Sequence, residues 1–184
     1  PVAEAVVTIP ANFANEARNE TMQAAKLAGL NVKYIVNEPT AAALYYAFKT
    51  GTELSGTYAV YDLGGGTFDI SIIRVIDQDI EVLISNGVTK LGGDDFDDVL
   101  IGIVEKKYRE KCGEDMDKGD YPKNDAEVDK KSLSVRNKVT TKVGRVLIEI
   151  SREEFEEGIS SKIAQTEMLC ESSLEEIGLT PNDI

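Results

Sequence analysis

Three consecutive glycines at positions 64–66 constrain this chain more than any other feature of its sequence. They separate two segments of strand-like composition, residues 58–62 and 68–76, and the second is expected to alternate buried and exposed side chains. A turn without Cβ atoms permits left-handed φ values and lets an anion approach the backbone N–H groups. The run DLGGGTFD at 62–69 therefore predicts a strand, a phosphate-binding turn and a second strand. The plainer interpretation is a hairpin turn, although a hairpin needs only one or two glycines.

Hydroxyl and carboxylate groups flank the predicted turn. Thr67 adds a hydroxyl donor, and Asp62 and Asp69 are placed to hold Mg²⁺ through its water molecules, since Mg²⁺ keeps much of its hydration shell. The ion and the backbone N–H groups would offset phosphate charge during transfer, while a carboxylate would orient the attacking water. Neither GxxxxGK[ST] nor GxGxxG occurs, so the turn is not a Walker loop or a dinucleotide fingerprint.

Bulk composition excludes several kinds of chemistry. The 184 residues suit one ordinary domain or two small subdomains, and the net charge of −13 argues against a nucleic-acid partner. Without histidine there is no His general base, and two cysteines 58 positions apart, Cys112 and Cys170, argue against a disulfide framework or a Cys/His zinc site. No apolar run is long enough to span a membrane. We expect a soluble protein of a reducing compartment, such as the cytoplasm.

Periodicity and turn signals predict an alternation of strands and helices. A strand, a helix capped by Asn12 or Asn15, and a second strand open the chain, and short links between the next three strands imply antiparallel pairing. Asp94 is expected to cap a long helix, and Ser151 with Glu154 forms a capping-box pattern. The predicted strands cover 4–9, 32–36, 58–62, 68–76, 80–85 and 142–150. The predicted helices cover 16–30, 40–48, 94–112, the last turns of a short helix at 127–134, and 152 to about 172 or 177, with a charged loop at 113–124. Gly29 stands where a left-handed residue is expected to stop the first helix.

Four segments resemble, in order, motifs of the 70-kDa heat-shock protein (DnaK-like) chaperone family: VTIPANF at 7–13, NEPTAAA at 37–43, DLGGGTFD at 62–69 and LGGDDFD at 91–97. The resemblance implies an α/β fold of the actin-like ATPase (ribonuclease H-like) class, incomplete in this chain. It assigns residues 1–51 to the C-terminal part of subdomain IA, residues 52–91 and 158–184 to a partial subdomain IIA, and residues 92–157 to subdomain IIB.

The resemblance also implies roles for the residues around the turn. Phosphate would contact Gly64, Gly65, Gly66 and Thr67, with Gly93 near the nucleotide. Asp62, Glu38 and Thr67 would form the catalytic set, and Asp62, Asp69 and Glu38 would hold Mg²⁺ through water. From the residues alone, the simpler interpretation of Glu38 is a charge favoured by a helix N-terminus.

Two further segments match the family position by position. The run at 127–134 resembles a helix that contacts adenosine, through Glu127, Lys130, Lys131 and Ser134. Lys131 replaces an arginine that would stack on adenine more effectively than a lysine. Pro10 and Arg18 match residues that relay nucleotide state between domains. From the residues alone, the helix end is an exposed charged segment, Pro10 ends a strand and Arg18 is a solvated helix residue.

The implied function is that of a heat-shock chaperone that hydrolyses Mg-ATP to control the binding and release of unfolded peptides. Its partners would be ATP or ADP, peptides bound by a separate substrate domain, a J-domain co-chaperone and a nucleotide-exchange factor. The alternative is a non-hydrolysing module offering a surface to such co-chaperones. A filament-forming ATPase or sugar kinase is a more distant alternative, against which NEPTAAA and LGGDDFD argue. A first phosphate loop, a nearby lysine and a closing glycine-rich adenosine motif are missing, so we expect this chain to bind Mg-ATP weakly or not at all.

Overall fold

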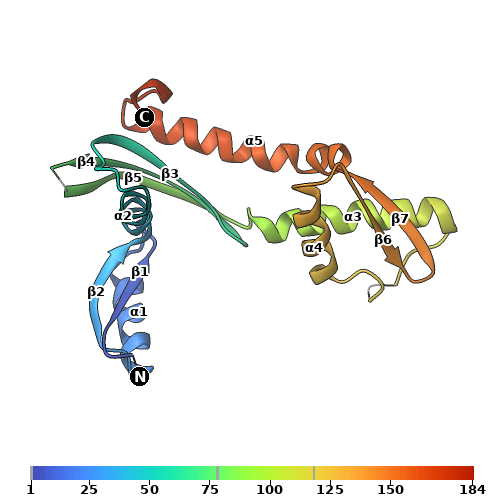
Figure 1. The fold of residues 1–184 in the computed structure, drawn as a ribbon, viewed down its shortest axis with the longest axis horizontal. Helices are drawn as coiled ribbons and strands as arrows, with labels where there is room; N and C mark the ends of the chain where they lie inside the picture. The colour runs from blue at the N-terminus through green and yellow to red at the C-terminus, as the bar shows by residue number, and fades with distance from the viewer. Residues whose placement is uncertain (1, 78, 118) are drawn as a thin grey trace. The chain divides into compact units, whose positions relative to one another are not determined.

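The computed structural model describes residues 2–77, 79–117 and 119–184. It is a mixed α/β structure, as predicted, with three small sheets and two compact units (Figure 1). Unit 1 comprises residues 1–62, 69–87 and 169–184, and unit 2 comprises residues 63–68 and 88–168. The elements in chain order are β1 (Ala5–Ile9), α1 (Asn15–Leu27), β2 (Val32–Asn37), α2 (Glu38–Thr50), β3 (Gly56–Leu63), β4 (Thr67–Ile76), β5 (Asp79–Thr89), α3 (Gly93–Cys112), α4 (Lys123–Leu133), β6 (Lys138–Val143), β7 (Val146–Ser151), α5 (Arg152–Glu176) and the short 3₁₀ helix η1 (Pro181–Asp183).

The predicted strand–helix–strand opening is confirmed in unit 1. β1 and β2 pair in parallel, and their register places Ile9 opposite Asn37. Because both strands end at the same edge, the residues that follow them, Pro10 and Glu38, meet there. This register is what brings the start of α2 to the functional pocket described below.

The start of α1 differs from the prediction. Its N-cap is Ala14, which makes no side-chain cap bond, so neither Asn12 nor Asn15 caps the helix. The turn in which the Phe13 N–H donates to the Pro10 carbonyl (3.2 Å) sets the entry of the chain instead. The predicted stop is confirmed, since Gly29 has a φ of +77° just after the helix.

A three-stranded sheet in the order β3-β4-β5 carries the second half of unit 1. β4 is central, and Ser71 and Ile73 are buried at 3% and 0% exposure, so the predicted alternation of buried and exposed residues is wrong. One face of this strand is covered by α2, whose Ala43 packs against Ile73 and Val75. Gln78 of the expected turn between β4 and β5 lies outside the described residues.

Unit 2 has its own apolar core beneath α3. The single strand predicted over 142–150 is instead the antiparallel hairpin β6–β7, in which Val143 pairs with Val146 and Gly144 turns with a φ of +58°. The capping box of Ser151 and Glu154 is confirmed by reciprocal bonds of 2.9 and 3.1 Å. The buried core residues are Phe96, Leu100, Val104, Tyr121, Ala126, Leu133, Val139, Val143, Ile148, Ile150 and Phe155.

The N-terminus of α3 is capped differently from the prediction. Gly92, not Asp94, is the N-cap, and its N–H donates to the Asp95 carboxylate at 2.9 Å. Cys112 and Cys170 are not joined in a disulfide. Among the helices of the described residues, none has the length and apolarity needed to cross a membrane.

Candidate functional site

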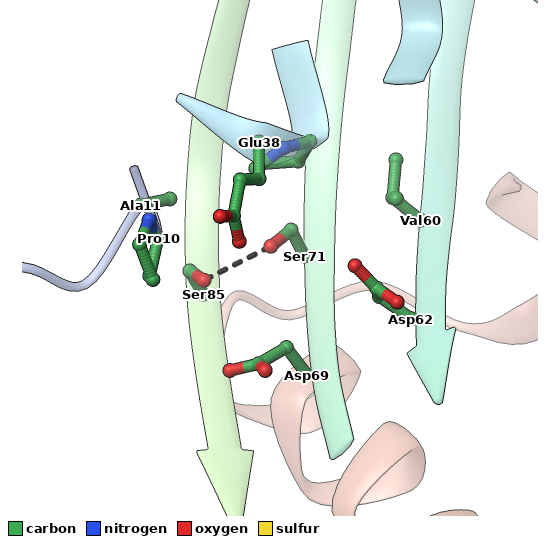
Figure 2. Close-up of a pocket in the computed structure, with 9 residues that line it drawn as sticks. Pro10, Ala11, Glu38, Val60, Asp62, Asp69, Ser71 and Ser85 are labelled. Atoms are coloured by element: carbon green, nitrogen blue, oxygen red, sulfur yellow. Dashed lines mark hydrogen bonds between the residues drawn. The ribbon is translucent and has the colours of Figure 1, made fainter. Parts of the chain in front are cut away.

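Three carboxylates line one pocket of unit 1 (Figure 2). Glu38 comes from the start of α2, Asp62 from β3 and Asp69 from β4. In Figure 2 the carboxylate of Glu38 points toward Ser71 and Ser85, whose hydroxyls lie 2.9 Å apart in a hydrogen bond across β4 and β5. The pocket is lined by Pro10, Ala11, Glu38, Pro39, Val60, Asp62, Asp69, Ser71 and Ser85.

The electrostatics of this pocket favour a cation. Burial raises the pKa of Glu38 above its usual value, and the charges of Asp62 and Asp69 raise it further. A carboxylate whose ionised form is disfavoured by its neighbours is stabilised when a cation enters, because the sign of the local field is reversed. In the described part of the chain, no three Asp, Glu, Cys or His side chains form a cluster able to hold a metal ion. Oxygen donors spaced around a pocket suit Mg²⁺, which keeps several of its waters between itself and the protein.

The glycine turn belongs to unit 2 and bonds to the start of α3. The Gly64 N–H closes the turn on the Thr67 carbonyl at 2.8 Å. The Gly64 carbonyl accepts from the Gly93 N–H at 2.9 Å, and the Gly65 carbonyl accepts from the Asp94 N–H at 2.7 Å. Two successive carbonyls of the turn are therefore held toward α3.

This arrangement fixes where the turn's N–H groups point. No described peptide bond is cis, and in a trans peptide the C=O and the following N–H point in opposite directions. The N–H groups of Gly65 and Gly66 therefore point away from α3. Among the described residues, neither of these two N–H groups has an acceptor in the protein. The turn thus presents two neighbouring free donors on one side, as an anion-binding turn requires.

The conformations of the three glycines correct one expectation. None has a left-handed φ, so the turn does not need glycine for its backbone angles. A Cβ on Gly66 would meet nothing within 4 Å, and one on Gly65 would meet only the Asp94 carboxylate, at 3.9 Å. The space where these Cβ atoms would stand is therefore open, and close approach of a ligand explains the glycines better than packing or a plain hairpin does.

Gly92 and Gly93 meet a different requirement. A Cβ on Gly92 would lie 2.4 Å from the Gly65 carbonyl oxygen and 2.7 Å from that of Gly64. Its φ of −174° is extended and open to any residue, so only contact with the turn demands glycine there. Gly93, predicted to lie near the nucleotide, adjoins the turn through its bond to the Gly64 carbonyl.

The predicted adenosine segment forms the C-terminal part of α4, also in unit 2. Lys131 pairs with Glu127 at 2.6 Å on the exposed face, and this contact lowers the pKa of Glu127. Lys130 instead points to α3, where its Nζ donates to the Gly93 carbonyl at 2.7 Å. Ser134 is the exposed C-cap of the helix. Lys130 therefore joins this segment to the glycine turn through Gly93.

Pro10 and Arg18, which the resemblance gives a shared relay role, lie in different surroundings. Pro10 lines the carboxylate pocket, whereas Arg18 is half-buried on α1 and does not line it. Sequence reasoning missed Ser71 and Ser85 in the pocket, for which the strand pattern gave no signal. It also missed Asp97, the buried partner of Lys130, although Asp97 stands at helical spacing from the core residues Leu100 and Val104.

Comparison with known proteins identifies the class to which these features belong. The family model described as Hsp70 protein matches residues 1–184, and the chain therefore belongs to the Hsp70 family. It is 42% identical over 180 residues to a chaperone protein HscA homolog of Histophilus somni (strain 129Pt), covering 98% of this chain and 29% of that protein. It is also 42% identical over 184 residues to the chaperone protein HscA of Salmonella newport (strain SL254), covering 97% of this chain and 29% of that protein. The chain thus spans 29% of the length of these curated relatives.

Proposed function

We propose that this chain forms part of the ATP-binding and ATP-hydrolysing domain of an Hsp70-type chaperone. The observation that carries the proposal is the glycine turn, in which the N–H groups of Gly65 and Gly66 have no acceptor among the described residues while the carbonyls of Gly64 and Gly65 bond to α3. Phosphate oxygens are the ligands that such converging donors bind. Thr67, exposed beside them, adds a hydroxyl donor.

In this proposal the adenosine portion of the nucleotide binds the end of α4. Lys130 is half-buried beside Gly93, and Lys131, Glu127 and Ser134 are exposed on the same helix end. The two binding elements belong to one compact unit, and the Lys130–Gly93 contact connects them. A nucleotide, unlike free phosphate, would engage both elements.

The carboxylate pocket supplies the remaining roles of the proposal. Glu38, Asp62 and Asp69 would hold Mg²⁺ through its waters, and the ion would neutralise phosphate charge when bound. Asp62 is exposed at the end of β3 and can accept a hydrogen bond from the attacking water, which orients it. The positive charge of the ion would lower the pKa of Glu38 again and favour its ionised form.

The wider function follows from the family. We propose that residues 1–51 correspond to part of subdomain IA, residues 52–91 and 158–184 to part of IIA, and residues 92–157 to IIB. ATP hydrolysis would control peptide binding in another part of the protein, with a J-domain co-chaperone and an exchange factor as partners. Pro10, at the carboxylate pocket, and Arg18 on α1 would relay the nucleotide state. No observation favours a purely non-hydrolysing interaction module.

Calorimetric titration with Mg-ADP and Mg-ATP tests the proposal. The substitution Gly66→Ala places a methyl group in the open space beside the free donors. Gly102→Ala is the matched control, because that Cβ also meets nothing within 4 Å but lies at an exposed position of α3, away from the turn. We expect weak binding by the wild-type chain and by Gly102→Ala, and a clear loss with Gly66→Ala. Asp62→Asn should weaken the dependence of binding on Mg²⁺.

One result would count against the proposal. It is a Gly66→Ala chain that binds as well as the Gly102→Ala control, because the turn would then not be the phosphate site.

A further inference from the structure

The carboxylate of Asp97 is buried in unit 2 although it takes no part in the roles proposed above. Its side chain is only 4% exposed, and it lies on the face of α3 that also carries the core residues Leu100 and Val104. A charge is expensive to bury, so a residue of this kind is expected to be paired and to serve a purpose that an apolar side chain could not.

The partner of Asp97 is Lys130 of α4. Lys130 Nζ lies 2.7 Å from Asp97 Oδ1, an ion pair whose alignment falls outside hydrogen-bond geometry, and it donates to the Gly93 carbonyl at 2.7 Å. The lysine side chain is itself only 18% exposed. The neighbouring Lys131 differs sharply, since its side chain is 70% exposed and its partner Glu127 is also accessible.

The pair lies next to the glycine turn. Lys130 Nζ would be 3.2 Å from a Cβ on Gly93, and the Gly93 N–H donates to the Gly64 carbonyl at 2.9 Å. Asp97 therefore holds the ammonium group where α4, the start of α3 and the turn meet. A lysine side chain has many rotamers, and fixing it before a ligand arrives lowers the entropy lost on binding.

We propose that Asp97 is a positioning residue that holds the ammonium group of Lys130 in place for a nucleotide bridging the glycine turn and α4. The inference rests on the proposed function. The inference gives the two adjacent lysines different roles. Lys130 is ordered before the nucleotide binds, whereas the exposed Lys131 becomes ordered on the nucleotide only when it binds.

The first test uses amine labelling and mass spectrometry, which need no nucleotide. Asp97→Asn removes the charge with little change of shape. Asp98→Asn is the matched control, since Asp98 is the next residue of α3, is exposed and pairs with Lys123 at 3.2 Å. We expect Lys130 to react more slowly than Lys131 in the wild-type chain and in the Asp98→Asn control. In Asp97→Asn, the labelling rate of Lys130 should approach that of Lys131. Unchanged labelling of Lys130 in Asp97→Asn would overturn the inference.

The second test compares the ADP affinity of the wild-type chain, Asp97→Asn and a double variant. Asp97→Asn should weaken binding by about fivefold, the effect of ordering one long side chain on binding. Lys130→Met alone leaves Asp97 buried without a partner and is expected to fold poorly, so the lysine is removed only in the double variant Asp97→Asn with Lys130→Met, which buries no charge. If Asp97 acts through Lys130, the double variant binds ADP no more tightly than Asp97→Asn.

The outcomes separate this inference from the proposed function. If the wild-type chain and Asp97→Asn bind ADP equally, the positioning role is refuted while the nucleotide site stands. A double variant that regains wild-type affinity also refutes it, because the lysine would then not be a ligand. If the wild-type chain binds no ADP, the labelling test alone decides the positioning role, because it needs no nucleotide.

Discussion

Substituting Gly92 should damage the structure, whereas substituting Gly66 should not. A Cβ at position 92 would stand 2.4 Å from the Gly65 carbonyl oxygen, and real Cβ atoms essentially never come within 3.0 Å of such an atom. The turn would therefore have to retreat from α3 by about 0.6 Å. Because the atoms in the way are backbone, no change of side-chain rotamer can relieve the clash.

The expected cost follows from what this retreat breaks. The bonds from Gly93 and Asp94 to the turn, now 2.9 and 2.7 Å, would lengthen toward or beyond the limit of a hydrogen bond. Each bond is worth about 1 kcal/mol, so weakening both by about half costs about 1 kcal/mol in total. Forced overpacking adds about 1–3 kcal/mol, so Gly92→Ala should lose about 2–4 kcal/mol. Gly66→Ala meets nothing within 4 Å and needs no left-handed φ, so it should stay within about 0.5 kcal/mol of wild type.

Urea unfolding followed by circular dichroism measures the difference. With a slope of about 2 kcal/mol per molar urea, the predicted loss moves the midpoint of Gly92→Ala down by about 1–2 M. Hydrogen exchange at the amides of Gly93 and Asp94 reports the same event locally, because their acceptors are the turn carbonyls. A Gly92→Ala chain with the wild-type midpoint and fully protected amides at both positions would refute the reasoning.

Three other substitutions have definite expected outcomes. Gly102→Ala, in the exposed middle of α3 with no neighbour within 4 Å of the new Cβ, should raise the unfolding free energy by about 1 kcal/mol in the same urea assay. Tyr121 is 2% exposed and donates to the Asp129 carboxylate at 2.8 Å, so Tyr121→Phe should cost about 1 kcal/mol. Burial, with that hydrogen bond, raises the pKa of Tyr121, so the wild-type chain should lose stability above about pH 10, where the unfolded chain ionises, and Tyr121→Phe should lose less. Glu38→Gln should raise the free energy of unfolding at pH 7 but not below about pH 4.5. The raised pKa means that ionising Glu38 costs more in the folded chain than in the unfolded chain, and glutamine removes that cost. Mg²⁺ should shrink the gain, which thermal unfolding across pH would measure.

The sequence predicted the elements better than it predicted their ends. Strong local signals succeeded: Pro10 after β1, Gly29 after α1 and the Ser151–Glu154 box before α5 each act within a few residues. The N-cap of α3 was wrong because contact with the glycine turn, distant in sequence, decides that Gly92 must stand there. Tertiary contact overrides capping preference whenever backbone must pass this close to backbone.

The candidate site shows the same division. The clustering of Glu38, Asp62 and Asp69 followed from motifs that each end or begin a strand or helix. The expected left-handed glycines were wrong because the turn closes through hydrogen bonds to α3, which sequence periodicity does not encode. The Asp97–Lys130 pair could not be predicted, because a charged residue at an apolar helix position does not indicate its partner, which here lies on another helix.

The bonds between α3 and the glycine turn have an electrical consequence. The peptide dipoles of a 20-residue helix leave partial positive charge at its first N–H groups, which here donate to the carbonyls of Gly64 and Gly65. A peptide group that accepts such a bond is polarised, so its own N–H becomes a stronger donor. The turn therefore acts as one additional peptide layer on α3 and passes the positive end of the helix outward to the N–H groups of Gly65 and Gly66. An anion there would feel the helix although it touches none of its residues.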